Sequence, residues 1–307
     1  MWWRPFSGVI PTGRIVRVGS RESRLALVQT EIVIRLLKDR RPELEFEVVK
    51  IKTQGDKLLD VNLSDAGGKG VFVKEIEEAL LAGSIDLAVH SMKDVPYELP
   101  EGLCIAAVTE REDPRDVLIS RDKRRLLNLR PGARIGTSSL RRSVQLKALR
   151  PDLDIVPVRG NVPTRIRKMD DLELDGLVLA AAGIKRLGLE ELIAEYFPPE
   201  VIVPAVGQGA LAVEARKDDD ILELAGLVSH KATEVAVRAE RSFMRALGGS
   251  CRVPLGAFAR VEGTVVTLVG MVEKNGSVCK GTMSGKLKEA EEIGLRLAER
   301  LGDSSDR

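Results

Sequence analysis

Hydrophobic and polar residues follow two alternating periods along the first part of the chain. Short apolar runs at residues 14–20, 44–51 and 85–90 are typical of strands, whereas residues 22–40 and 71–83 carry apolar side chains at helical spacing. Strands that alternate with helices in this way predict parallel βαβ units, in which crossover helices cover the sheet.

The same alternation resumes after Pro114. The predicted segments are strands at residues 133–137, 154–158 and 175–180 and helices at residues 139–150 and 162–169. Either Ser138 or Ser139 caps the first of these helices. This part of the chain is therefore expected to form a second α/β unit.

The pattern changes toward the C-terminal end. A helix at 231–247 precedes three strand-like segments at 255–261, 264–272 and 277–285, and a last helix is predicted at 286–301. Strands grouped beside helices predict a small α+β domain. The length of 307 residues exceeds one ordinary core and fits two or three domains.

Charge is distributed unevenly along the chain. Residues 121–170 contain 14 Lys and Arg against 4 Asp, although the formal net charge of the whole chain is only +2. Such a region attracts an anion. The segment has no Phe, Tyr or Trp on which bases stack, which favours a multiply charged small molecule over nucleic acid. A solvated basic face is the remaining alternative.

Small, hydroxyl-bearing and charged residues follow five of the predicted strands. Ligands of parallel α/β sheets lie beyond the carboxyl ends of the strands, and amides at helix starts bind carboxylates or phosphates. Arg141 and Arg142 stand at a helix start, where cations are unfavourable, so an anion is expected there. The five segments are residues 19–23, 53–56, 90–96, 136–142 and 159–161.

Asp94 follows a predicted strand and precedes the turn that Pro96 fixes. Its carboxylate has two interpretations: a turn cap bonded to its own backbone, or a group that stabilises a developing cation. Asp56 has the same alternatives, and Lys93 beside Asp94 is in the simpler interpretation a surface ion pair. The glycine-rich residues 67–70 lack the spacing of a nucleotide-binding P-loop.

The three cysteines, Cys104, Cys251 and Cys279, are far apart. Neither a disulfide framework nor a zinc site is expected, because the chain has no Cys-x-x-Cys pair and only two histidines. Cys104 and Cys279 fit small inert hydrophobes. Cys251 lies in LGGSCRVPLG, where the glycines leave little to cover it, so both an inert and a reactive thiol stay open.

No apolar run approaches the roughly 20 residues that span a bilayer. The first residues, MWWRPFSGVIPTG, lack the apolar core and small-residue cleavage site of a signal peptide. We therefore expect a cytoplasmic protein without a membrane segment.

Seven stretches of the chain carry a resemblance to a known family. They are HSMKDVP, EREDPRDVLIS, GTSSLRR, RGNVPTRIRK, LAAAGIKRLG, PAVGQGALAVE and the glycine-rich turn around Cys251. From about Arg14 to its end the chain resembles the porphobilinogen deaminases, also called hydroxymethylbilane synthases.

The resemblance implies a transferase of tetrapyrrole and haem biosynthesis. In that family the cysteine of this turn, here Cys251, holds a dipyrromethane cofactor through a thioether bond. Four porphobilinogen molecules are added to this primer stepwise, each with loss of ammonia, and hydroxymethylbilane is released by hydrolysis. Because every pyrrole ring carries an acetate and a propionate, the basic segment 121–170 is expected to cradle a polyanion.

Asp94 is the catalytic residue that the resemblance implies, a carboxylate that stabilises positive pyrrole nitrogens and assists proton transfer. The implied cofactor-binding residues are Cys251, Lys93, Asp94, Thr137, Ser138, Ser139, Arg141, Arg142, Arg159 and Gly160. The implied substrate-binding residues are Arg21, Ser23, Lys69, Phe72, Arg159, Arg165 and Arg186. Asp56 matches a further acidic position near the cofactor, and no metal is implied.

The implied fold is α/β: two domains like those of periplasmic binding proteins form a cleft, and a small α+β C-terminal domain follows. The expected boundaries are residues 14–109 with 205–228 for domain 1, 110–204 for domain 2 with the basic cleft face, and 229–307 for domain 3 with Cys251.

Three residues depart from the family pattern. Arg24 stands where the family often has Pro, and Ser250 stands where Gly is common before the cysteine. Asp65 replaces a Lys that several members carry, which puts in doubt only a basic contact from that loop.

Two other classes of function stay open on the residues alone. A bilobed anion-binding protein without chemistry has the same fold but leaves Cys251 without a use. A nucleic-acid-binding protein is disfavoured by the missing aromatic residues. As an enzyme, the chain is expected to act on porphobilinogen as a monomer, without a nucleic-acid or membrane partner.

Overall fold

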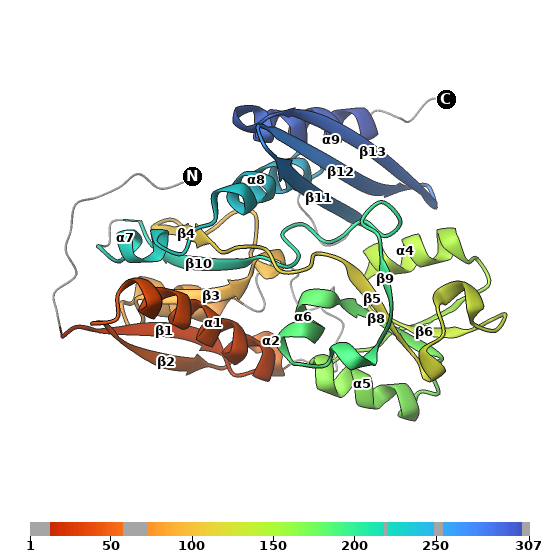
Figure 1. Ribbon diagram of the computed structural model, residues 1–307, viewed down its shortest axis with the longest axis horizontal. Helices are drawn as coiled ribbons and strands as arrows, with labels where there is room; N and C mark the ends of the chain where they lie inside the picture. The colour runs from red at the N-terminus through yellow and green to blue at the C-terminus, as the bar shows by residue number, and fades with distance from the viewer. Residues whose placement is uncertain (1–12, 58–72, 218–219, 249–253, 303–307) are drawn as a thin grey trace. The chain divides into compact units, whose positions relative to one another are not determined.

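The computed structural model describes residues 13–57, 73–217, 220–248 and 254–302 (Figure 1). The chain divides into two compact units. The first unit comprises the chain up to residue 111 together with 210–234, and the second comprises 112–209 together with 235–307. The three-domain boundaries stay a prediction.

The first unit is built around one five-stranded sheet. Its elements are β1 (Ile15–Arg21), α1 (Arg24–Arg40), β2 (Glu45–Ile51), α2 (Gln54–Lys57), α3 (Lys74–Leu81), β3 (Leu87–Ser91), the 3-10 turn η1 (Met92–Asp94), β4 (Leu103–Val108), β10 (Leu211–Arg216) and α7 (Ile221–Gly226). The strand order is β2-β1-β3-β10-β4. β1 pairs in parallel with β2 and β3, whereas β10 pairs antiparallel with both β3 and β4.

Helix α1 shows how apolar residues at helical spacing form one buried face of a helix. The Ser23 hydroxyl accepts a hydrogen bond from the amide of Ala26 and caps the helix. One face of α1, with Val33 and Leu37, is fully buried in the core that contains Val16 and Val18 of β1. Burial of side chains of this size contributes about 1.5–3 kcal/mol each.

The second unit contains a sheet of the same design. Its elements are β5 (Asp116–Ser120), β6 (Arg134–Gly136), α4 (Leu140–Leu149), β7 (Asp154–Val156), α5 (Val162–Asp171), β8 (Gly176–Ala180), α6 (Ala181–Arg186) and β9 (Ile193–Phe197). The strand order is β7-β6-β8-β5-β9. β6 pairs in parallel with β7 and β8, and β5 pairs antiparallel with β8 and β9.

The predicted parallel βαβ units are confirmed for the strands on which the prediction was based. Each sheet holds one reversed strand, β10 in the first unit and β5 in the second. β5 is the first strand after the chain leaves the first unit, and β10 is the first strand after it returns.

The rest of the second unit is a three-stranded antiparallel sheet with two helices. The elements are α8 (Lys231–Ala246), whose first turn belongs to the first unit, β11 (Leu255–Glu262), β12 (Val265–Lys274), β13 (Ser277–Lys286) and α9 (Ala290–Gly302). α9 packs on β12 and β13 (Figure 1). The last helix begins four residues later than predicted, because residues 287–289 form a separate 3-10 turn. These elements confirm the small α+β region.

No helix within the described ranges is long and apolar enough to cross a bilayer.

Gly294 of α9 lies directly against the backbone of α8. A Cβ at this position would lie 2.3 Å from the Ala239 carbonyl oxygen and 2.7 Å from the Phe243 amide nitrogen, and neither backbone atom can move away cheaply. We expect Gly294→Ala to lower the free energy of unfolding by about 1–3 kcal/mol through overpacking. Urea denaturation measures this effect. Gly302→Ala is the control, because a Cβ there has nothing within 4 Å, and equal stabilities of the two variants would contradict the prediction.

Candidate active site

One small pocket of the first unit collects residues from the ends of β1 and β3. Its volume is about 60 Å³. The lining residues are Arg21, Ser23, Leu25, Ala26, Gln29, Val73, Val89, His90, Ser91 and Asp94. Arg21, Ser23 and Asp94, three of the predicted site residues, are thus brought together at the carboxyl ends of parallel strands.

Hydrogen bonds of the two residues at the end of β3 and the start of η1 fix the backbone that leads to Asp94. Ser91 exchanges hydrogen bonds with Gln29 of α1, with Oγ–Nε2 and Oγ–Oε1 distances of 2.9 and 3.2 Å. The Met92 amide donates to the Ala210 carbonyl at 3.0 Å. The Met92 side chain is buried, so its packing also anchors the turn that follows β3.

The Asp94 carboxylate is exposed at the end of this turn. It makes no hydrogen bond or ion pair in the part of the chain that the structure describes, so it does not cap its own turn there. A carboxylate held on an anchored turn with free oxygens is suited to meet a positive group of a ligand.

Three ionisable side chains are buried together at this pocket, one of which, His90, also lines it. His90 of β3 and Glu214 of β10 place Nε2 and Oε2 3.0 Å apart, and Glu77 of α3 lies near them. All three side chains are buried. Among the described residues, Glu77 Oε1 and both Glu214 oxygens lack a hydrogen-bond partner. Burial, and then repulsion from Glu214, raises the pKa of Glu77 to about 7.

In the second unit the predicted hydroxyl residues form the junction between β6 and α4. Ser139, not Ser138, caps α4 by accepting from the Arg142 amide. Ser138 Oγ donates to the Val158 carbonyl at 2.9 Å, and Thr137 Oγ1 accepts from the Ser139 amide at 3.2 Å. The first turn of α4 contains no acidic residue, so its positive end is left for an external anion.

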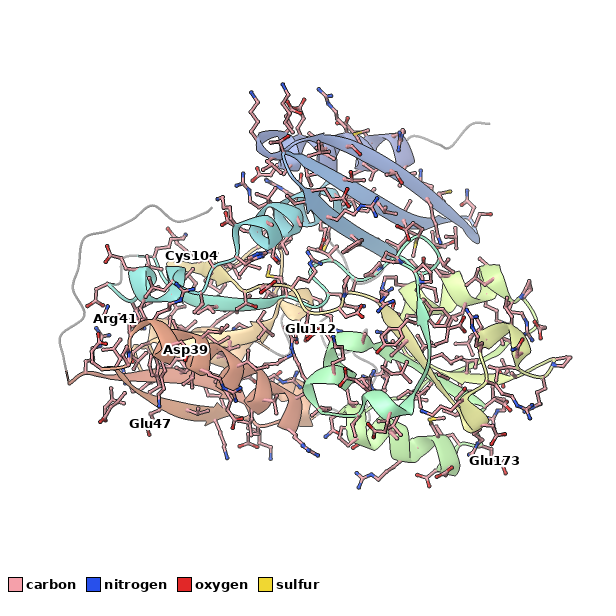
Figure 2. All side chains as sticks on the ribbon, in the orientation of Figure 1. Asp39, Arg41, Glu47, Cys104, Glu112 and Glu173 are labelled. Carbon is pink, nitrogen blue, oxygen red and sulfur yellow. The ribbon has the colours of Figure 1, made fainter. Side chains whose placement is uncertain are left out.

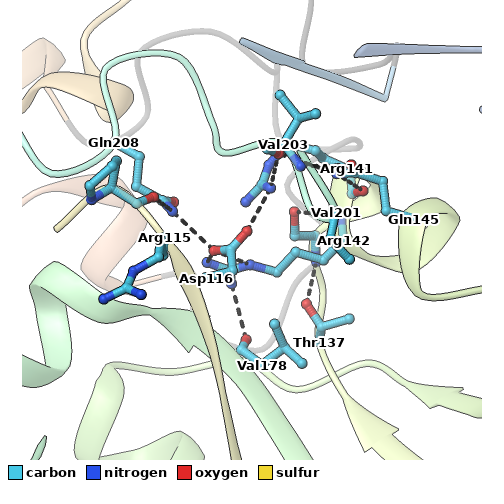
Figure 3. Close-up of polar contacts among 12 residues, drawn as sticks. Arg115, Asp116, Thr137, Arg141, Arg142, Gln145, Val178, Val201, Val203 and Gln208 are labelled. Atoms are coloured by element: carbon cyan, nitrogen blue, oxygen red, sulfur yellow. Dashed lines mark hydrogen bonds and ion pairs between the residues drawn. The ribbon is translucent and has the colours of Figure 1, made fainter. Parts of the chain in front are cut away.

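Arg141 and Arg142 point from this helix start into the interior of the second unit (Figure 3). Both guanidinium groups meet the carboxylate of Asp116, which opens β5. Arg141 Nη1 lies 2.7 Å from Asp116 Oδ2, while Arg142 Nε and Nη2 lie 3.0 and 2.7 Å from Asp116 Oδ1. We call these three residues the arginine–aspartate cluster. The Asp116 side chain is fully buried, and the two arginine side chains are 7% and 6% exposed.

The cluster combines two positive charges with one negative charge. Burial favours a neutral Asp116, but attraction by Arg141 and Arg142 outweighs it and holds the pKa of Asp116 well below its ordinary value. Burial lowers the pKa of Arg141, and Asp116 offsets part of that effect. No other described carboxylate pairs with either guanidinium. A net charge of +1 is therefore buried where an anion was predicted.

Arg159, Gly160 and Arg165 lie at the next strand-to-helix junction, between β7 and α5. Gly160 has φ +117, and a Cβ on it would meet Thr164 Cγ2 at 2.8 Å, so only glycine fits. Arg165 Nε donates to the Gly160 carbonyl at 2.7 Å. Asn161 caps α5 by accepting from the Thr164 amide at 2.9 Å.

Arg186 ends α6, and its Nη2 donates to the Gly209 carbonyl at 2.7 Å. Burial lowers the pKa of Arg186 to about 10, and Glu112, labelled in Figure 2, offsets part of this shift. Glu112 also pairs with Lys185, the residue before Arg186.

Of the remaining predicted site residues, only Lys93 has a described side chain. Lys93 is exposed beside Asp94. Cys251, Lys69 and Phe72 lie outside the described residues, as do Asp65 and Ser250, and the side chain of Asp56 is not described. Sequence reasoning missed Asp116, although EREDPRDVLIS contains it. Only its burial beside two arginines distinguishes it from the neighbouring acidic residues.

The basic segment 121–170 is less positive in the structure than in the sequence. At least eight of its 14 basic side chains form ion pairs with residues that the structure describes. Arg125 and Arg130, for example, pair with Glu195 and Asp175 from beyond the segment. Much of the positive charge of the segment is therefore neutralised within the fold.

Two family models match the chain in tandem. The model described as "Porphobilinogen deaminase, dipyromethane cofactor binding domain" matches residues 16–223, and "Porphobilinogen deaminase, C-terminal domain" matches residues 234–303. The chain belongs to the porphobilinogen deaminase family. It is accordingly an enzyme, a transferase of tetrapyrrole biosynthesis that acts on porphobilinogen and uses a dipyrromethane cofactor.

Relatives resemble the chain along almost its whole length. The porphobilinogen deaminase of Syntrophus aciditrophicus is 54% identical over 299 residues, which cover 95% of this chain and 96% of the relative. That of Syntrophotalea carbinolica is 55% identical over 289 residues, which cover 93% and 92%. Family membership decides between the classes of function left open above, in favour of the enzyme.

Among solved structures, the periplasmic aliphatic sulphonate binding protein SsuA from Escherichia coli is 15% identical with a TM-score of 0.40, and the match covers 77% of this chain and 71% of that chain. The predicted fold class, two α/β sheets of one design and a small α+β region, is confirmed. The cleft stays a prediction.

The raised pKa of Glu77 predicts how stability depends on pH. Because Glu77 titrates near pH 7 when folded and near 4.5 when unfolded, the folded state retains its proton longer. The free energy of unfolding should therefore fall as the pH rises from about 4.5 to about 7. Glu77→Gln, which mimics the protonated form, should flatten this slope in urea denaturation at several pH values. Glu31→Gln, a change of an exposed carboxylate on α1, is the control, and an unchanged slope in Glu77→Gln would contradict the prediction.

Proposed function

We propose that the condensation of porphobilinogen by this enzyme is divided between two sets of residues. Asp94 in the first unit acts on the reacting pyrrole nitrogen, and arginines of the second unit bind the acidic side chains of the pyrrole rings. The single observation that carries this division is the arginine–aspartate cluster, whose buried charge of +1 calls for an external carboxylate.

The residues present fit a dipyrromethane. It is an apolar ring pair with four carboxylates, and the second unit offers arginine forks and the positive ends of α4 and α5, whose first turns contain no acidic residue. The residues that would hold it are Arg141, Arg142 and Arg159, the hydroxyl residues 137–139 between β6 and α4, Gly160 and Lys93. Cys251 would bind it through a thioether. When bound, the dipyrromethane supplies the nucleophilic pyrrole carbon.

Asp94 is the group that acts on the substrate. As ammonia leaves porphobilinogen, positive charge develops on the pyrrole nitrogen, and the free Asp94 carboxylate stabilises it by proximity and by accepting the N–H hydrogen bond. The same oxygens then assist removal of the ring proton after carbon–carbon bond formation. The substrate is oriented through its acetate and propionate. The residues that orient it are Arg21, Ser23, Lys69, Phe72, Arg165 and Arg186.

We also propose that the enzyme is a cytoplasmic monomer that binds no nucleic acid. The extensive pairing of the basic segment supports the last point, since paired arginines release few counterions on contact with a phosphate backbone. Light scattering after gel filtration, with and without nucleic acid, tests the oligomeric state and the absence of binding.

The thioether assignment predicts a mass difference. Purified wild-type protein, after incubation with porphobilinogen, should exceed the mass of its polypeptide by two porphobilinogens less two ammonias. Cys251→Ala should lack this excess, because the substitution removes the sulfur that would form the thioether. Cys279→Ala, a change of a half-buried thiol on β13, should keep it. An excess that persists in Cys251→Ala would overturn the assignment.

Asp94→Asn tests the catalytic carboxylate. The amide keeps the shape but loses the negative charge, so we expect turnover to fall by about two orders of magnitude or more while the melting temperature is retained. Product is measured as porphyrin absorbance after cyclisation and oxidation. Glu98→Gln, an exposed carboxylate in the following turn, is the matched control. Normal turnover of Asp94→Asn would exclude the proposed role.

A further inference from the structure

The arginine–aspartate cluster distributes its hydrogen bonds unevenly. Arg142 uses all three nitrogens: Nε and Nη2 donate to Asp116, and Nη1 donates to the Val178 carbonyl at 3.1 Å. Arg141 donates through Nη1 alone, to Asp116 and to the Val203 carbonyl, as far as the described residues go. One edge of the Arg141 guanidinium, formed by Nε and Nη2, is therefore left over.

An edge with two parallel N–H groups is the part of arginine that matches a carboxylate in bidentate fashion. Which edge is left over depends on Asp116. Its Oδ2 and the Val203 carbonyl together hold Nη1, and this sets the rotation of the guanidinium about its last torsion. The flexible arginine becomes a donor of defined direction.

Asp116 is itself held from a third side. Gln208 Nε2 donates to Asp116 Oδ1 at 3.0 Å and to the Pro114 carbonyl at 2.7 Å (Figure 3). Gln145 of α4 ties the Val203 backbone to the same place, with Oε1 accepting from the Val203 amide at 2.8 Å. The carboxylate is fully buried, so it acts on a ligand only through the arginines.

We propose that Asp116 is a positioning residue for the condensation: it orients Arg141 so that the Nε–Nη2 edge receives a carboxylate of the oligopyrrole. This proposal rests on the proposed function, in which Arg141 binds such a carboxylate. It adds a residue that touches neither substrate nor cofactor yet determines the geometry of their binding.

Positioning and simple charge tuning predict opposite results. In Asp116→Asn the net charge of the cluster rises from +1 to +2, so a role in charge alone would strengthen anion binding. Loss of orientation instead weakens it. We expect Asp116→Asn to load less dipyrromethane, to raise KM, and to lower kcat/KM by about tenfold to a hundredfold, the effect of a misplacement near 1 Å.

The experiment measures the intact mass after incubation with porphobilinogen, the steady-state kinetics and the melting temperature of each variant. Asp152→Asn is the matched control, because it removes an exposed aspartate that also pairs with an arginine, Arg150. It should load and turn over like the wild type.

Gln208→Met covers the case in which Asp116→Asn does not fold. This variant keeps every charge of the cluster but removes the hydrogen bond that the uncharged Gln208 side chain donates to Asp116. Positioning therefore predicts a raised KM, whereas charge tuning predicts an unchanged KM. Wild-type kinetics in every folded variant, Asp116→Asn or Gln208→Met, would overturn the proposal.

Arg141→Gln separates this proposal from the proposed function. If Arg141→Gln fails to load while the Asp116 and Gln208 variants behave as wild type, only the positioning role is lost. If Arg141→Gln itself loads and turns over normally, the binding role of Arg141 fails as well.

Discussion

The second unit depends on one buried carboxylate between two buried guanidinium groups. Removing three charges from water costs several kcal/mol per ion, and this cost is offset only where the charges pair and their remaining hydrogen bonds are satisfied. Asp116 and Arg142 meet this condition, and Arg141 meets it except at its Nε–Nη2 edge; together they join the start of β5 to α4 and to the backbone at Val178 and Val203. The pairing therefore dictates how these segments pack.

The same interaction gives the second unit a buried positive charge that suits an acidic ligand. Two cations against one anion leave a single positive charge, in a site from which water is largely excluded and electrostatic attraction is strong. Elsewhere in the basic segment the structure neutralises arginines with local acidic partners. Positive charge is thus concentrated at a strand-to-helix junction, where backbone amides add to it.

The first unit has a sheet of the same topology, but it presents a negative group in place of positive ones. There the carboxyl ends of β1 and β3 present an exposed carboxylate, Asp94, on a turn anchored by Met92 and by the Gln29–Ser91 pair. In the proposed function, the arginines of the second unit bind the carboxylates of the pyrrole substrate, and Asp94 stabilises the cation that develops on its nitrogen. Sheets of one design thereby serve opposite electrostatic roles.

Periodicity in the sequence was sufficient for α1, α4, α8 and the parallel strands, because their apolar spacing reflects local geometry. The motifs around Asp94, Arg141 and Cys251 were sufficient to identify the family. Sequence reasoning missed β5 and β10 as reversed strands, and it gave Asp116 no role. A reversed strand pairs with residues distant in the chain, and the partner of a buried charge is selected by packing in three dimensions. Local composition and spacing report on neither, so only the tertiary structure decided them.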